Sequence, residues 1–86
     1  MLVHYNIDTD DLREMCCRNG FYTCGNNKAY SNMFDIARQG TDIDTVEAVA
    51  RDIIEHSADE YELTDVMETI INTATYISVE EQEGGA

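Results

Sequence analysis

The residues that could carry chemistry are three cysteines and two histidines: Cys16, Cys17, Cys24, His4 and His56. A zinc site usually contains a local pair of ligands, with two residues between cysteines or about three to five between histidines. This chain has no such pair. A Cys–His nucleophilic pair would have to be assembled from distant segments, and no glycine-rich phosphate or oxyanion loop accompanies it. We therefore predict no metal, no cofactor and no enzymatic activity, and we interpret the cysteines as small core residues.

Two acidic runs, at residues 8–11 and 42–44, have the oxygen ligands that calcium prefers. An EF-hand loop also needs glycine at its sixth position and glutamate at its twelfth. The twelfth positions here are Asn19 and Ile53, and neither sixth position is glycine. The sequence therefore excludes an EF-hand.

The cysteine count and the N-terminal segment bear on the cellular compartment. Three cysteines cannot all pair within one chain, and the adjacent Cys16 and Cys17 would point about 100° apart on a helix. Residues 1–11 lack the basic stretch and apolar core of a secretory signal. No apolar run approaches the roughly 20 residues that cross a bilayer. We predict a cytoplasmic protein with three reduced thiols.

The charge is the compositional feature that points to a function. The 86 residues carry 18 acids and 5 bases, a formal net charge of −13. Residues 1–51 hold eight acids and all five bases, a net −3, whereas residues 52–86 hold ten acids and no base, a net −10. Such a chain repels nucleic acid and anionic membranes and is attracted to basic clefts. We therefore predict a basic protein partner, with no direct binding to nucleic acid or membrane.

The acids cluster around the connection between the last two predicted helices. Carboxylates on successive helical turns lie about 5–6 Å apart, comparable with the spacing of phosphates along a nucleic-acid strand. The predicted partner-binding residues are seven acids with one tyrosine as an aromatic anchor: Asp52, Glu55, Asp59, Glu60, Tyr61, Glu62, Asp65 and Glu68. The alternative interpretation is an ordinary solvated helix exterior that keeps the protein dissolved.

Four segments have the apolar spacing of amphipathic helices, and two of them lie in the first half of the chain. The first is capped by Asp8 or Thr9 and ends at residues 19–20, an Asn-Gly pair typical of a left-handed stop. The second begins at residues 26–27 and ends at residues 39–40. The predicted core residues of these two helices are Leu12, Met15, Cys16, Tyr30, Met33, Phe34 and Ala37.

The other two predicted helices contain most of the β-branched residues. The third has Asp44 and Glu47 as a capping box, Ile43 as a hydrophobic staple and His56 at its end. The fourth has Thr64 as its N-cap. Their predicted inward residues are Val46, Val49, Ala50, Ile53, Ile54, Leu63, Val66, Met67, Ile70, Ile71, Ala74 and Ile77.

Three segments have strand-like features. Residues 2–7 alternate, with Val3, Tyr5 and Ile7 on one side. They either form a β-ribbon with residues 21–24 or lie as an extended arm, with residues 21–24 then forming an aromatic-rich loop. Residues 75–79 are either the end of the fourth helix or a strand, because threonine and isoleucine favour strands.

These elements predict an all-α fold, a compact bundle of about four short helices with the short N-terminal strand or ribbon as an addition. Residues 1–79 would form a single helical domain, and a domain of this size has a thin core. Residues 80–86 would form an acidic disordered tail.

In size, acidity and lack of catalytic motifs, the chain resembles the small proteins that phages and plasmids use against host defence, especially anti-CRISPR proteins and anti-restriction DNA mimics. The resemblance implies an inhibitor that occupies the nucleic-acid-binding surface of a partner enzyme. The chain is also similar to the acidic four-helix immunity proteins that neutralise bacterial nuclease toxins. Those proteins carry a two-tyrosine, proline-containing stretch on a short helix, where this chain has Asp59-Glu60-Tyr61.

Two alternative functions follow from the same features. One is a structural or assembly module that self-associates, for example as a homodimer, through apolar surface at Phe21, Tyr22 and residues 76–79. The other is an immunity or antitoxin-like protein that binds a nuclease toxin.

Overall fold

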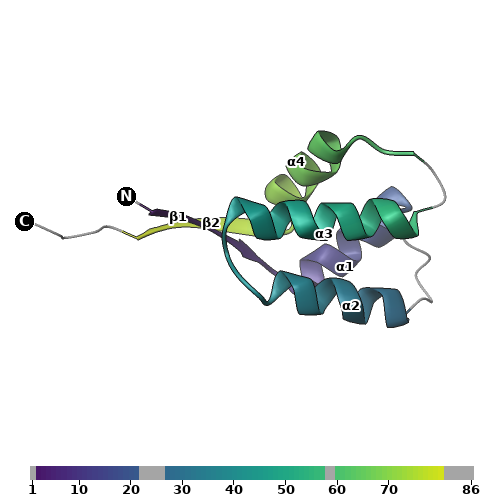
Figure 1. Ribbon diagram of the computed structural model, residues 1–86, viewed down its shortest axis with the longest axis horizontal. Coiled ribbons are helices and arrows are strands. Elements are labelled where there is room, and N and C mark those ends of the chain that lie inside the picture. Colours follow the sequence, from purple (N-terminus) through teal and green to yellow (C-terminus); the bar gives the residue numbers. More distant parts are fainter. Residues whose placement is uncertain (1, 22–26, 58–59, 81–86) are drawn as a thin grey trace, which may run out of the picture.

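The computed structural model describes residues 2–21, 27–57 and 60–80. Within these ranges the chain forms four helices and two strands (Figure 1). In chain order the elements are β1 (Leu2–Ile7), α1 (Thr9–Asn19), α2 (Asn27–Ala37), α3 (Ile43–His56), α4 (Leu63–Thr73) and β2 (Thr75–Glu80).

The helices form the body of the molecule, and the two strands form an arm that projects from one end of it (Figure 1). β1 and β2 pair antiparallel, with Leu2 opposite Glu80 and Ile7 opposite Thr75. The prediction of four short helices is confirmed. The fold is mostly helical but is not all-α, because the predicted N-terminal strand pairs with a second strand after α4 to form a small antiparallel sheet.

Of the two alternatives for residues 75–79, the end of the fourth helix or a strand, the structure has the strand, β2. α4 ends at Thr73, and the next residues are β-branched or aromatic and pair along β1. Ile77, predicted to point into the core, is 55% exposed on the arm. β2 also takes the place predicted for residues 21–24 as the partner of β1. Of those four, residues 22–24 lie outside the described residues.

The boundaries of α1 confirm the capping prediction. The Asp8 carboxylate accepts hydrogen bonds from the backbone N–H groups of Asp10 and Asp11, at 2.9 and 3.0 Å. Gly20 ends the helix with φ of 69°, a left-handed conformation that costs glycine little. α2 begins as predicted and ends at Ala37, two residues before the predicted end.

The starts of α3 and α4 differ from the prediction by about two residues. Asp42, rather than Asp44, caps α3, because its carboxylate accepts bonds from both N–H and Oγ1 of Thr45, at 3.0 and 2.7 Å. The predicted staple residue, Ile43, is the first residue of the helix and is 42% exposed. Glu62, rather than Thr64, occupies the N-cap position of α4, without a side-chain capping bond.

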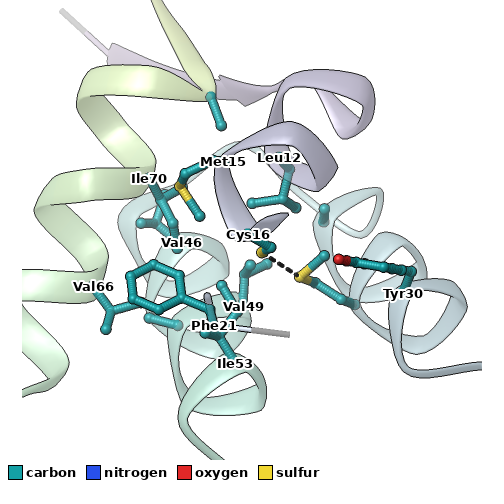
Figure 2. Packing of buried hydrophobic residues seen from close by; sticks show 14 residues of the cluster. Leu12, Met15, Cys16, Phe21, Tyr30, Val46, Val49, Ile53, Val66 and Ile70 are labelled. Atoms are coloured by element: carbon teal, nitrogen blue, oxygen red, sulfur yellow. Dashed lines mark hydrogen bonds between the residues drawn. The ribbon is translucent and has the colours of Figure 1, made fainter. Parts of the chain in front are cut away.

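All four helices contribute to one apolar core (Figure 2). The buried residues are Leu12, Met15, Cys16, Phe21, Tyr30, Met33, Ala37, Val46, Val49, Ala50, Ile53, Val66, Ile70 and Ala74. The remaining predicted core residues of the helices, such as Phe34, Ile54 and Met67, are half-buried against this cluster. The core therefore agrees with the predicted apolar faces up to Ala74, where the helical spacing stops applying.

Candidate functional site

The α3–α4 connection lies at the end of the molecule opposite the β1–β2 arm (Figure 1). This is the region in which the sequence predicts a binding surface. Five of the eight predicted residues are exposed there: Glu55, Glu60, Glu62, Asp65 and Glu68. We call these five carboxylates the acidic end. Of the other three predicted residues, Tyr61 is half-buried, Asp52 is buried, and Asp59 lies outside the described residues.

The five carboxylates follow one another along the chain from the last turn of α3, through the connection, to the second turn of α4, and α3 packs against α4. Glu55 is in the last turn of α3. Glu62, Asp65 and Glu68 follow one another at three-residue spacing from the N-cap of α4, so neighbouring Cβ atoms lie about 5–6 Å apart. The backbone therefore places negative charge on successive turns, as the sequence predicts.

Within the described residues, the five carboxylates of the acidic end have no bonding role in the fold, although Asp65 lies in the first turn of α4, where the helix N-terminus favours an acid. Among the described residues, no hydrogen bond or ion pair reaches any of its five carboxylate groups. Most acids of the first half do have such a role. Asp8 and Asp42 cap helices, and three others form ion pairs within their helices: Glu14–Arg18, Asp35–Arg38 and Glu47–Arg51.

An open hollow of about 350 Å³ lies beside the acidic end, lined by Arg51, Ile54, Glu55, Tyr61 and Leu63. Arg51 is the last base of the chain, and its guanidinium pairs with Glu47 at 3.2 Å. The hollow therefore joins the carboxylate of Glu55 to half-buried apolar and aromatic surface. A protein partner could place a basic or amphipathic side chain there, since interface anchors usually combine apolar contact with charge.

Tyr61 is held by the core as well as facing the hollow. Its ring packs edge-to-face on Phe21, with ring centroids 4.8 Å apart and an interplanar angle of 77°. Phe21 itself is buried, which removes it from the surface predicted for self-association. Tyr61 can thus serve as a pre-positioned anchor only through the part of its ring that the core leaves exposed.

Asp52 does not belong to the acidic end. Its side chain is turned towards α2, where Asn32 Nδ2 donates a hydrogen bond of 2.9 Å to Asp52 Oδ1. His56 lies one turn later, with Nδ1 2.8 Å from the Asp52 carbonyl oxygen. The position could have been recognised in the sequence, because Asp52 follows Val49 by three residues and so borders the inner face of α3. Its inclusion among the partner-binding residues is corrected here.

The cysteines also differ from the prediction. Cys16 is a free, buried thiol that donates a hydrogen bond to the Met33 sulfur at 4.0 Å (Figure 2). Burial raises the pKa of the Cys16 thiol to about 12. Cys17 is disulfide-bonded, so the prediction of three reduced thiols is wrong, and the argument from cysteines to a cytoplasmic location is lost. Cys24 lies outside the described residues.

The histidines lie far apart, His4 in the arm and His56 at the other end of α3 (Figure 1). His4 Nδ1 lies 2.8 Å from Thr41 Oγ1, which ties the arm to the turn before α3. Within residues 2–21, 27–57 and 60–80, no group of three or more His, Cys, Asp or Glu side chains is arranged to hold a metal ion. No helix in the same ranges is long and apolar enough to span a membrane.

Comparison of the chain with protein-family models, with curated proteins and with solved structures gives no match. A function for the acidic end therefore has to be argued from its own geometry and charge.

Proposed function

We propose that this protein is a non-enzymatic inhibitor whose acidic end binds the basic nucleic-acid-binding surface of a partner protein, in competition with DNA or RNA. The observation that carries the proposal is that five exposed carboxylates lie between the last turn of α3 and the second turn of α4, and that none of them makes a side-chain capping bond or an ion pair among the described residues. Like charges held close together repel one another and destabilise the folded state. Apart from Asp65, which the N-terminus of α4 favours, these carboxylates repel one another without a bond that stabilises the fold, and recognition by a partner is the explanation that we propose for them.

The geometry of the acidic end suits a surface that normally holds phosphates. Its carboxylates follow the turns of α4, and the neighbouring hollow supplies apolar and aromatic contact through Ile54, Tyr61 and Leu63. A basic cleft offers arginine and lysine side chains, which form charge-assisted hydrogen bonds with carboxylates as with phosphates. Binding of this kind is fast and weakens as salt is added.

A host enzyme that acts on nucleic acid, such as a defence nuclease, is the class of partner that this chemistry fits, and we propose that the protein meets it in the cytoplasm. A nuclease toxin would present the same basic cleft, so an immunity function belongs to the same proposal. The identity of the partner separates the two.

The test uses a variant in which the acidic end is made neutral: Glu55→Gln, Glu60→Gln, Glu62→Gln, Asp65→Asn and Glu68→Gln. A matched control neutralises five acids of α1, α2 and the first turn of α3: Asp10→Asn, Asp11→Asn, Glu14→Gln, Asp35→Asn and Asp44→Asn. Each set removes five of the 18 acids and leaves a formal net charge of −8. The two variants therefore differ in where the charge lies and not in how much there is.

Immobilised wild type is expected to capture a basic protein from a bacterial lysate at low salt and to release it at high salt. The captured protein is then titrated with fluorescent duplex DNA or RNA, with and without the wild type. Wild type and control should displace the nucleic acid, and the neutral acidic end should not. Equal loss of displacement in both variants would mean that only total charge matters, and unchanged displacement in the acidic-end variant would refute the proposal.

A further inference from the structure

The β1–β2 arm carries the largest exposed apolar side chains of the described chain outside the helices. Directly opposite residues of an antiparallel pair lie on the same face of the sheet. Val3 is opposite Val79, and Tyr5 is opposite Ile77, so these residues share one face. Tyr5 packs against the core, whereas Val3, Ile77 and Val79 are 39%, 55% and 50% exposed. The apolar face therefore continues past the helices towards the tip of the arm.

The two edges of the arm differ. The outer edge of β1 is covered near Tyr5, whose N–H donates to the Thr41 carbonyl, and His4 contacts the same threonine. The N–H of Tyr5 therefore points away from β2, so Tyr5 and its partner Ile77 form a non-hydrogen-bonded pair. Because the two kinds of pair alternate along an antiparallel ladder, the other odd-numbered residues are in non-hydrogen-bonded pairs as well. The hydrogen bond from Asp8 N–H to the Ala74 carbonyl independently shows that the even-numbered residues are the ones that bond across the ladder.

It follows that the N–H and C=O groups of Thr75, Ile77 and Val79 point away from β1, along the outer edge of β2. Among the described residues, none forms a backbone hydrogen bond with this edge. Three alternate residues with outward-facing main-chain groups are thus available to pair with another strand.

Natural proteins usually protect such an edge with lysine, proline, a β-bulge or an inward-pointing charge. β2 has the sequence Thr-Tyr-Ile-Ser-Val-Glu, without lysine or proline, and its register with β1 is unbroken over all six pairs. A two-stranded ribbon is also only marginally stable by itself in water. The edge of β2 therefore has the features of a strand that receives a partner strand.

The distribution of charge indicates which molecule supplies the strand that pairs with β2. The chain carries 18 acids, but none falls within residues 2–7 or 75–79. A basic protein would find no carboxylate to bind on this part of the arm. A second copy of a chain with a net charge of −13 is repelled from the acidic helices and can approach most closely here.

We propose that the protein forms a homodimer in which β2 pairs antiparallel with β2 of a second copy, around a twofold axis at Ile77. The result is a continuous four-stranded sheet with the order β1, β2, β2 and β1. The proposal is independent of the inhibitor function, because it uses the opposite end of the molecule (Figure 1).

The register follows from the outward-facing groups. Ile77 faces Ile77 of the second copy, and Thr75 faces Val79, so all three pairs on the edge are hydrogen-bonded pairs, each with two main-chain bonds. No two acids face each other, because the first acid, Glu80, falls opposite Ala74 of the second copy. A twofold axis perpendicular to the sheet keeps both apolar faces on one side, so the apolar side chains of the two arms form a single surface.

The oligomeric state is measured by sedimentation velocity from low to high protein concentration, at low and at high salt. Wild type should change from monomer to dimer with concentration. The dimer should become tighter with added salt, because screening reduces repulsion between two negative chains. This direction is opposite to that expected for the acidic end and its basic partner. A wild type that stays monomeric at every concentration and salt would overturn the proposal.

Two substitutions at the axis separate edge pairing from apolar docking. Ile77→Pro removes an N–H that points outwards from β2 and leaves the hydrogen bonds between β1 and β2 intact. Proline is tolerated at such a position of an edge strand. It should weaken the dimer about 30-fold or more, through loss of both central hydrogen bonds. Ile77→Thr keeps the N–H and removes apolar surface, and should weaken the dimer about 10-fold or less. Equal weakening by both variants would exclude the edge pairing.

Cross-linking tests the register without destabilising the arm. Ile77→Cys places two cysteines opposite each other, with Cα atoms about 5.5 Å apart, within reach of a disulfide. Thr75→Cys is the matched control, because its symmetry mate is four positions away, about 13 Å. Under mild oxidation Ile77→Cys should give a cross-linked dimer well above the wild-type background, and Thr75→Cys should not. Equal yields in the two variants, or background yield in both, would refute the register.

Discussion

The side-chain amide of Asn32 in α2 donates a 2.9 Å hydrogen bond to the carboxylate of Asp52 in α3. Asp52 is only 7% exposed, so the bond joins two packed helices at a buried acid. A buried carboxylate is stable only when it is hydrogen-bonded or paired. This acid therefore serves the fold, whereas the acids of the connection that follows do not.

Replacing either member of this pair should destabilise the protein. Asn32→Ala leaves the Asp52 carboxylate with one bond fewer in a buried site, and we expect a loss of about 1–3 kcal/mol in the free energy of unfolding. Urea denaturation measures the change. Asp52→Ala combined with Asn32→Ala should cost less than the sum of the two single changes, because the pair acts as a unit. Strict additivity would show that the two side chains do not interact.

Neutralising the acidic end should stabilise the fold. The variant with Glu55, Glu60, Glu62, Asp65 and Glu68 made neutral loses the repulsion among five carboxylates and only one favourable interaction, that of Asp65 with the N-terminus of α4, so its melting temperature should rise at low salt. Each change should contribute about 0.5 kcal/mol or less. The difference from wild type should shrink at 0.15 M salt, where screening acts over about 8 Å.

The control for that prediction is the variant in which the matched acids of α1, α2 and the first turn of α3 are neutral. Asp10, Asp11 and Asp44 lie in the first turns of α1 and α3, and Glu14 and Asp35 form ion pairs. Neutralising these acids removes favourable interactions with helix N-termini and bases, so the melting temperature should stay level or fall. A rise equal to that of the acidic-end variant would show that both sets of acids are equivalent.

Asp42 should make the free energy of unfolding depend on pH in the acidic range. Hydrogen bonds from Thr45 lower the pKa of the Asp42 carboxyl below its ordinary value of 3.8. Its contribution is therefore fully present above that ordinary value and is lost as the pH falls through the lower value in the folded protein. Asp42→Asn still caps the helix without titrating, so the advantage of wild type over this variant should be constant above pH 4 and decrease below it. Urea midpoints at several pH values measure this difference.

Cys16 should be inert to alkylation until the protein unfolds. A pKa of about 12 in place of 9.0 leaves about a thousand-fold less thiolate at pH 8, and the thiolate is the reactive form. Iodoacetamide should label Cys16 in denaturant and leave it unlabelled in buffer. Without reductant, the adjacent Cys17 should stay unlabelled in both conditions because it is disulfide-bonded. Mass spectrometry of the tryptic peptide 14–18, which contains both cysteines, reads the two outcomes.

Ile53 tests the packing of the core. Its side chain is fully buried in α3, so Ile53→Val should cost about 0.5–1.5 kcal/mol. The exposed Ile43 in the same helix provides the control, since Ile43→Val removes the same methylene group from a site 42% exposed to water. Urea denaturation should place the control within about 0.5 kcal/mol of wild type. Equal losses at the two positions would contradict the burial of Ile53.

Local signals predicted the helices well because they act within a few residues. The Asp8 cap and the Gly20 stop depend only on neighbouring backbone groups, and both lie where the sequence places them. The start of α3 was predicted two residues late because Asp42 and Asp44 are both good caps. The choice was decided by Thr45, which donates to Asp42 through both its N–H and its hydroxyl group.

The strand formed by residues 75–80 and the hydrogen bond to Asp52 depend on residues far apart in the chain. The apolar spacing of the α4 sequence continues through Ile77 and left both helix and strand open for residues 75–79, and pairing with residues 2–7, more than sixty positions earlier, makes residues 75–80 a strand. The spacing of α3 places Asp52 at the border of its inner face, but the partner of the buried carboxylate is Asn32, twenty positions away on another helix. The five carboxylates of the acidic end were predicted correctly as exposed, because polar residues opposite an apolar stripe face solvent in any such bundle.

Leu2 and Glu80 face each other at the tip of the arm, so both ends of the described chain leave the molecule at the same place, remote from the acidic end (Figure 1). An affinity tag or fluorescent protein joined close to either terminus would therefore stand beside the arm. It would obstruct pairing with a second copy and leave the acidic end open to a partner. Tagged and untagged protein should consequently differ in assembly and agree in binding to a basic target.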